Sequence, residues 1–204
     1  MTLRQTLALV RSDYRRLSRT MSIPISFPRV LFVACMPSIM ALTLFRLSHW
    51  LYVKRVRSLA WMTWMFNTYL TGADIAPYSS IGASCYIGHA LGCRIGARIG
   101  DNATIFGTVG IGGGRGRGDV GAGEGLPVIG DDVVIGDGAR VLGPIRVGDR
   151  AMIGAMTLVL KDVPADMVVV GIPARVLKPR SASIDYEALE RGREPRQSRR
   201  DPQT

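Results

Sequence analysis

Small apolar residues recur at every sixth position through the middle of the chain. All thirteen positions of this register are apolar, and they fall into two series. The series are Ile75, Ile81, Ile87, Cys93, Ile99, Ile105 and Ile111, then Ile129, Ile135, Val141, Val147, Ile153 and Val159. Glycine directly follows eight of the thirteen, and glycine tolerates the backbone conformations of tight turns. Because six is not a multiple of the 3.6-residue helical turn, the pattern excludes an amphipathic helix.

The period of six predicts a parallel β-helix over residues 73–177. Three short strands joined by tight turns make an eighteen-residue triangular coil, and successive coils stack about 4.8 Å apart. The apolar residue of each hexad then points inward onto its equivalent in the next coil. Ile111 and Ile129 are eighteen residues apart, which is three hexads. A loop over residues 112–128 can therefore leave the coil and return in register.

Five short motifs within the repeats resemble those of a known enzyme family. They are Asp74-Ile75-Ala76-Pro77, the sequence IGHALG from Ile87, Ile111-Gly112-Gly113, Pro127-Val128-Ile129-Gly130 and the sequence GIPARV from Gly171. Over residues 74–177 the chain resembles the hexapeptide acyltransferases. It is most similar to the serine O-acetyltransferase family, including that family's relatives in exopolysaccharide gene clusters. The resemblance implies a left-handed parallel β-helix, usually a homotrimer or a multiple of one, with active sites between neighbouring subunits.

The resemblance also implies a direct transfer mechanism that uses acetyl-CoA as co-substrate. His89 matches the family's catalytic base, and Asp74 matches the aspartate that orients it. The chemistry agrees with this assignment, because a hydroxyl nucleophile needs a base with a pKa near 7. A carboxylate on the other ring nitrogen would fix the tautomer and stabilise the imidazolium.

Further positions match the groove in which the family binds CoA. They are Gly113, Asp137 and Ala155, and Lys178 could reach the CoA phosphates. The backbone N–H groups near Gly112 and Gly113 could hold the oxyanion, so Gly112 is included in the predicted cofactor site. The loop adds Arg115 and Arg117, which are equally well explained as solvated charges.

Two departures from the family pattern bear on the acceptor. The serine enzymes carry an acidic residue before the histidine, where this chain has Gly88, and an Arg-His pair in the loop, where it has Gly125-Leu126. Those groups hold the ammonium and carboxylate of the amino acid, and unpaired charges are costly to desolvate. The sequence therefore favours a saccharide acceptor in polysaccharide biosynthesis. L-serine O-acetylation in cysteine biosynthesis and a non-catalytic β-helix scaffold remain the alternatives.

The distribution of charge along the chain limits the classes of partner molecule. The 204-residue chain has a net charge of +10, of which residues 1–60 carry +9 and residues 61–177 carry −1. A nucleic-acid-binding domain should carry its basic stripe on the folded domain, so no nucleic acid is expected. Only two histidines occur, which argues against a histidine-rich zinc site, and no metal is predicted. Three cysteines without an even-numbered framework favour a reducing compartment.

Residues 1–72 combine this positive charge with apolar runs. The run over residues 30–45 is shorter than the roughly twenty residues that span a bilayer, and Pro37 would kink a helix there. A second apolar stretch follows the basic segment Lys54-Arg55-Val56-Arg57. Together these features predict a helical hairpin that lies on an anionic membrane surface or packs on the β-helix or a partner subunit. The expected location is the cytoplasm, with a peripheral position at the inner face of the membrane as the alternative. The tail, residues 178–204, is predicted to form a short helix at about 184–191 and then disorder.

Overall fold

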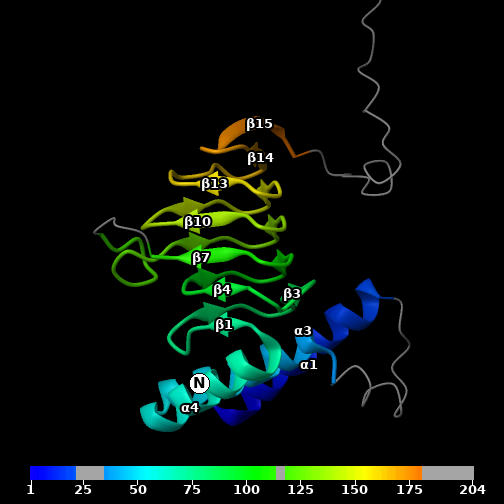
Figure 1. Cartoon of the computed structure of the whole chain (residues 1–204), viewed down its shortest axis with the longest axis vertical. Helices are drawn as coiled ribbons and strands as arrows, with labels where there is room; N and C mark the ends of the chain where they lie inside the picture. Colours follow the sequence, from blue (N-terminus) through cyan, green and yellow to red (C-terminus); the bar gives the residue numbers. More distant parts are fainter. Residues whose placement is uncertain (22–34, 114–117, 181–204) are drawn as a thin grey trace, which may run out of the picture.

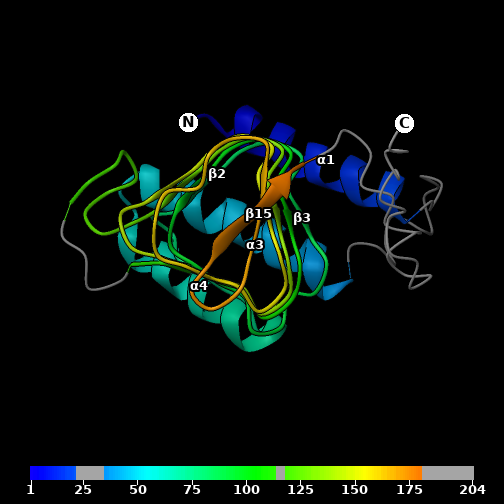
Figure 2. The same ribbon diagram turned by 90° about the horizontal axis from the view of Figure 1, so that it is seen from above.

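A computed structural model describes residues 1–21, 35–113 and 118–180. Three helices form a layer from which a column of short strands rises (Figure 1). The helices are α1 (Leu3–Thr20), α3 (Pro37–Val53) and α4 (Arg57–Thr71). α3 lies between α1 and α4 and packs against both of them (Figure 2).

The strands form three sheets, which we call A, B and C. Sheet A contains β1 (Asp74–Ile75), β4 (Arg94–Ile95), β7 (Gly110–Gly112), β10 (Arg140–Leu142) and β13 (Leu158–Val159). Sheet B contains β2 (Ser80–Ile81), β5 (Arg98–Ile99), β8 (Val128–Ile129) and β11 (Arg146–Val147). Sheet C contains β3 (Tyr86–Ile87), β6 (Thr104–Ile105), β9 (Val134–Ile135), β12 (Met152–Ile153), β14 (Met167–Val170) and β15 (Arg175–Pro179).

Neighbouring strands pair in parallel in all three sheets, with the single antiparallel pair of β14 and β15 at the far end. Each coil visits sheets A, B and C in turn, and the coils superimpose as a rounded triangle when seen along the axis (Figure 2). The predicted parallel β-helix is confirmed. All thirteen hexad positions are buried, and none exceeds the 4% exposure of Ile81.

One hexad assignment needs correction. The six-residue count places Cys93 in the inward ladder, but Ile95 is the residue that pairs with Ile75 and Ile111. The turn from sheet C to sheet A is eight residues from Ile87 to Ile95, and the next turn is four residues from Ile95 to Ile99. A two-residue insertion and a two-residue deletion cancel, so the sequence keeps its apparent period. Cys93 is nevertheless fully buried, as its apolar setting predicts.

The loop after Gly112 leaves and rejoins the coil as predicted. Ile99 pairs with Ile129 thirty residues later, which is one eighteen-residue coil plus two extra hexads. Arg115 and Arg117 lie outside the described residues, and so does the predicted short helix in the tail.

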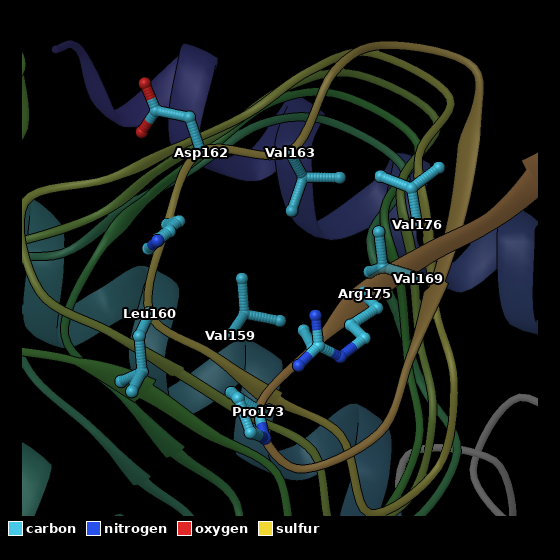
Figure 3. Close-up of a pocket in the computed structure, with 10 residues that line it drawn as sticks. Val159, Leu160, Asp162, Val163, Val169, Pro173, Arg175 and Val176 are labelled. Atoms are coloured by element: carbon cyan, nitrogen blue, oxygen red, sulfur yellow. The ribbon is translucent and has the colours of Figure 1, made fainter.

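At its far end the column is crossed by β15. A pocket of about 370 Å³ lies there, and Val159, Val163 and Val169 line its floor (Figure 3). These three residues belong to the buried core.

The N-terminal region differs from the prediction in two respects. Pro37 does not kink a helix but begins one, at a position where proline's missing N–H costs nothing. Within residues 1–72, which are predicted to be α-helical, α1 is a further helix ahead of the predicted hairpin, and Thr2 and Gln5 form a capping box at its start that the sequence displays.

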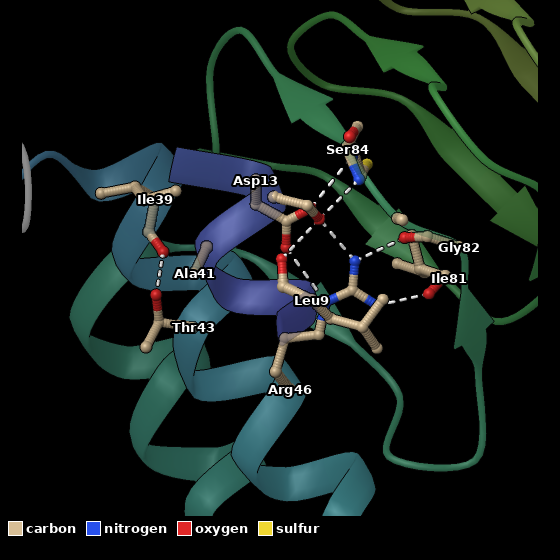
Figure 4. A network of polar contacts seen from close by, with 12 residues as sticks. Leu9, Asp13, Ile39, Ala41, Thr43, Arg46, Ile81, Gly82 and Ser84 are labelled. Atoms are coloured by element: carbon tan, nitrogen blue, oxygen red, sulfur yellow. Dashed lines mark hydrogen bonds and ion pairs between the residues drawn. The ribbon is translucent and has the colours of Figure 1, made fainter. Parts of the chain in front are cut away.

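A buried ion pair holds this helical layer to the first coil (Figure 4). The Arg46 guanidinium on α3 donates to both carboxylate oxygens of Asp13 on α1, at 3.1 and 3.2 Å. It also donates to the carbonyl oxygens of Ile81 and Gly82, and Asp13 accepts from the Cys85 N–H at 3.0 Å. These five groups join α1 and α3 to the β-helix. Neither of the two charged side chains is more than 2% exposed.

Candidate active site

The longest turn from sheet C to sheet A carries His89. Every other turn between inward residues of these two sheets has six residues, as between Ile105 and Ile111, whereas the His89 turn has eight. The Gly92 N–H donates to the Gly72 carbonyl at 2.9 Å, and the Cys93 thiol donates to the His89 carbonyl at 3.1 Å. Gly92 has φ +75°, which favours glycine. The two extra residues therefore let His89 project from the corner, while the hydrogen bonds of Gly92 and Cys93 keep the backbone of the turn in place.

The His89 side chain is exposed beside a cavity of about 540 Å³. Among the hydrogen bonds between described residues, none involves its ring. Leu70, Leu91 and Phe106 give the cavity a mostly apolar lining. The imidazole is thus free to meet a bound hydroxyl.

Asp74 stands at the start of β1, at the same corner as His89. Its backbone N–H donates to the Cys93 carbonyl at 2.8 Å, which ties it to the end of the His89 turn. Its Oδ1 accepts from Trp64 Nε1 on α4 at 2.8 Å. No hydrogen bond between Asp74 and His89 occurs in the described part of the chain, so the dyad remains a prediction.

The coils above His89 place further residues in one column. Because Ile87, Ile105, Ile135 and Ile153 are in register, the residues two positions later also stack. That column consists of His89, Gly107, Asp137 and Ala155. A Cβ built on Gly107 would lie 3.0 Å from His89 Cβ and 3.5 Å from Asp137 Oδ1. Glycine at position 107 therefore lets the coil backbone lie directly against His89 and near this carboxylate, with no room for a side chain there.

The structure thus places four of the predicted site residues at one corner of the β-helix, namely His89, Asp74, Asp137 and Ala155. It adds Gly107 and Thr108, which the sequence analysis did not single out. Gly107 separates His89 from Asp137, and the Thr108 hydroxyl donates to Asp137 Oδ1. The coil register was the signal that could have identified both residues, since they lie eighteen and nineteen residues after His89.

The other predicted groove residues lie elsewhere on the chain. Gly112 ends β7 and Gly113 follows it, at the turn that leaves sheet A for the loop, which is the opposite end of the sheet from His89. Lys178 lies on β15, paired with Val168 at the far end of sheet C. Within one chain these residues do not share a corner with His89.

The second histidine has a different environment. His49 Nδ1 lies 3.0 Å from the Pro77 carbonyl oxygen, and burial lowers the pKa of this imidazole. The buried Cys85 thiol is also unsuited to catalysis, because burial raises its pKa to about 12. Within the described ranges, no three His, Cys, Asp or Glu residues are grouped so that they could hold a metal ion.

At the positions that depart from the family pattern, backbone groups make the hydrogen bonds. Gly88 accepts from the Ser38 hydroxyl through its carbonyl at 3.1 Å. Gly125 is buried in the loop, and its N–H donates to the Gly118 carbonyl at 2.7 Å. Neither position supplies a charge for an amino-acid acceptor.

Comparison with known proteins identifies the family. The Bacterial transferase hexapeptide (six repeats) family matches residues 127–161. The chain is 45% identical over 147 residues to the serine acetyltransferase of Mycobacterium tuberculosis, a match that covers 71% of this chain and 62% of that protein. It is 38% identical over 144 residues to the serine acetyltransferase of Helicobacter pylori, covering 69% of this chain and 81% of that protein.

Solved structures give the same relationship. The crystal structure of the Neisseria gonorrhoeae serine acetyltransferase superimposes with a TM-score of 0.76 and 31% identity, covering 88% of this chain and 68% of that one. The match spans less than two thirds of several curated relatives, including 61% of the Synechococcus elongatus serine acetyltransferase. With four fifths of the Helicobacter pylori protein matched at 38% identity, the chain belongs to the serine acetyltransferase family of hexapeptide-repeat transferases.

Proposed function

We propose that this protein transfers the acetyl group of acetyl-CoA to the hydroxyl of L-serine, with His89 as general base. The observation that carries the proposal is an unengaged histidine, exposed at a corner where the coil above it has no side chain, in a chain of the serine acetyltransferase family. The names of the relatives support L-serine as the acceptor. They do not support the saccharide acceptor that the sequence analysis favoured.

The reaction follows from general-base chemistry. The His89 imidazole accepts the proton of the serine hydroxyl as its oxygen attacks the thioester carbonyl carbon. The C–S bond then breaks, and the imidazolium returns the proton to the CoA thiolate. A carboxylate that orients the ring would stabilise the intermediate imidazolium, and Asp74 and Asp137 both lie at this corner.

Acetyl-CoA fits the column above His89 because its walls carry small groups. Gly107 has no side chain above His89, and Ala155 is exposed two coils further on. Asp137 could accept from an amide N–H of the pantetheine arm, and Lys178 is an exposed cation on β15, away from the His89 corner of the same chain. CoA would supply the activated acyl group, and these residues would orient it.

The function is tested by thiol release from acetyl-CoA in the presence of L-serine, free hexoses or no acceptor. We expect kcat/KM for L-serine above about 10⁴ M⁻¹s⁻¹, as for true enzyme substrates. Release that depends on a hexose rather than on serine would restore the saccharide hypothesis. Absence of acceptor-dependent release with every compound would favour the scaffold.

The oligomer is a second expected outcome. Gly112 and Gly113 lie at the opposite end of sheet A from His89, so a site that uses both corners needs a second copy of the chain. We expect a homotrimer or a multiple of it in solution, measured by size-exclusion chromatography with light scattering. A monomer with full activity would contradict this assembly.

A peripheral membrane position is the third expected outcome. The exposed face of α4 carries Leu59, Met62, Met65, Phe66 and Tyr69, and Lys54, Arg55 and Arg57 are exposed near its start. None of the helices in the described ranges is long and apolar enough to cross a bilayer. We expect co-sedimentation with phosphatidylglycerol vesicles that weakens with salt, and little with phosphatidylcholine vesicles. Protein that stays in the supernatant at low salt would leave packing against another subunit as the explanation of this face.

A further inference from the structure

Sheet A carries two arginines beside the His89 corner. Arg94 begins β4, the strand that follows the His89 turn, and its Cα pairs with Asp74 on one side and Gly110 on the other. Arg140 begins β10 and pairs with Gly110 from the opposite side. Strand residues in register point to the same face, so both arginines lie on the outer face of the sheet. Both are exposed.

The Arg140 side chain folds back over Gly110, toward the strand of Arg94. A Cβ on Gly110 would lie 2.7 Å from Arg140 Cδ and 3.2 Å from Nε, so the side chain takes this path across the glycine. Arg140 Nη1 donates to the carbonyl oxygens of Thr108, Gly138 and Ala139. These three acceptors anchor the guanidinium and leave Nε and Nη2 without a hydrogen-bond partner among the described residues.

Arg94 has no hydrogen bond or ion pair from its side chain within the described part of the chain. Two other arginines of the β-helix make hydrogen bonds or ion pairs. Arg98 donates to the Gly121 carbonyl from sheet B, and Arg150 pairs with Asp166. Arg94 is therefore an uncompensated cation one strand from Asp74.

From this arrangement we propose that Arg94, with Arg140 two strands away on the same face, forms an anion subsite that binds the carboxylate of the acceptor. Arginine suits this task because its planar donors match a carboxylate in a bidentate geometry. The subsite supplies the charge that Gly125-Leu126 of the loop does not. It restricts the acceptor to hydroxy compounds with a nearby carboxylate, which include L-serine and hexuronic acids.

The phosphates of CoA are the other source of an anion. The subsite lies beside the residues that would hold the reacting hydroxyl, whereas CoA phosphates are separated from the thioester by the whole pantetheine arm. The acceptor carboxylate is therefore the better match. This assignment rests on the proposed acetyl transfer at His89.

The test compares Arg94→Gln with wild type, using L-serine and serinamide, which lacks the carboxylate. We expect KM for L-serine to rise about 10- to 100-fold in Arg94→Gln, as for loss of a charged hydrogen bond, with kcat nearly unchanged. Serinamide should react equally with both proteins, and Arg94→Lys should recover part of the loss. Arg146→Gln removes an exposed arginine from sheet B and serves as the matched control, with no change in KM expected.

Several outcomes would overturn the subsite. An equal loss with L-serine and serinamide would show that Arg94 does not bind the carboxylate. A rise in KM for acetyl-CoA that is absent with acetyl-pantetheine, which lacks the nucleotide phosphates, would assign Arg94 to CoA.

Failure of the proposed function is distinguishable from failure of the subsite. If wild type transfers acetyl groups to no acceptor, the function fails, and calorimetric titration with L-serine and with D-glucuronate still tests the subsite. Binding by wild type that is lost in Arg94→Gln supports it. Equal binding by the two proteins, or no binding of either carboxylate by wild type, overturns it.

Discussion

Replacing His89 by alanine is expected to lower kcat for acetyl transfer to L-serine by about 10²–10⁴, the usual range for loss of a general base. The ring is exposed and makes no hydrogen bond to a described residue, so its removal should disturb the fold little while leaving the hydroxyl without a proton acceptor. The measurement is thiol release at saturating acetyl-CoA and L-serine. Calorimetry should show that CoA still binds.

His49→Gln is the matched control, because it removes the other histidine. His49 contacts the Pro77 carbonyl and belongs to the packing of α3 on the first coil, so kcat should stay within a few-fold of wild type. Near-normal turnover by His89→Ala would exclude this mechanism.

Asp74→Asn should lower kcat as well, but by less than His89→Ala. The carboxylate would orient the ring rather than accept the proton, and Trp64 Nε1 already engages one of its oxygens. Asp137→Asn tested in parallel would show which of the two carboxylates at this corner acts on His89. The carboxylate whose replacement lowers kcat less can be set aside.

Replacing Asp13 by asparagine is expected to lower the free energy of unfolding by about 3–5 kcal/mol, the range for breaking a buried ion pair. The change leaves the buried Arg46 guanidinium without a counter-charge, although Arg46 still meets the carbonyl oxygens of Ile81 and Gly82. The measurement is urea unfolding at one fixed protein concentration, since an oligomer's stability depends on concentration.

Two further variants make this result specific. Asp166→Asn breaks the exposed ion pair with Arg150, whose groups are 60% and 45% exposed, and should change stability little. The double replacement Asp13→Leu with Arg46→Met removes both charges and should recover part of the loss, because the backbone partners of the two side chains stay unpaired. A single Asp13→Asn variant as stable as wild type would show that the pair does not hold the helical layer to the β-helix.

The proposed acceptor subsite changes how the departures from the family pattern are interpreted. The absence of charge at Gly88 and Gly125-Leu126 counts against a charged acceptor only if its carboxylate must be bound from the same positions as in the relatives. Arg94 supplies a cation from the sheet instead, next to Asp74. The missing loop charges and an L-serine acceptor are then compatible.

The sequence by itself determined the β-helix, because its thirteen apolar positions repeat with a period that neither a helix nor an ordinary sheet would impose. It also pointed to His89 and Asp74, since the motifs around them are local. It could not place β4, where an insertion and a deletion of two residues cancel and Ile95 rather than Cys93 joins the inward ladder. Counting along the chain cannot detect a change that leaves the count unaltered.

Only the tertiary structure decided which residues meet across the coils and between the helices and the first coil. Gly107 and Asp137 stand above His89 because parallel pairing stacks residues eighteen or thirty positions apart. Asp13 meets Arg46 thirty-three residues away because α1 and α3 pack together on the first coil. Arg94 faces the same corner as Asp74 because the longer His89 turn returns the chain to sheet A beside β1. These contacts depend on strand register and helix packing, which are settled by burial of the whole core rather than by any local segment.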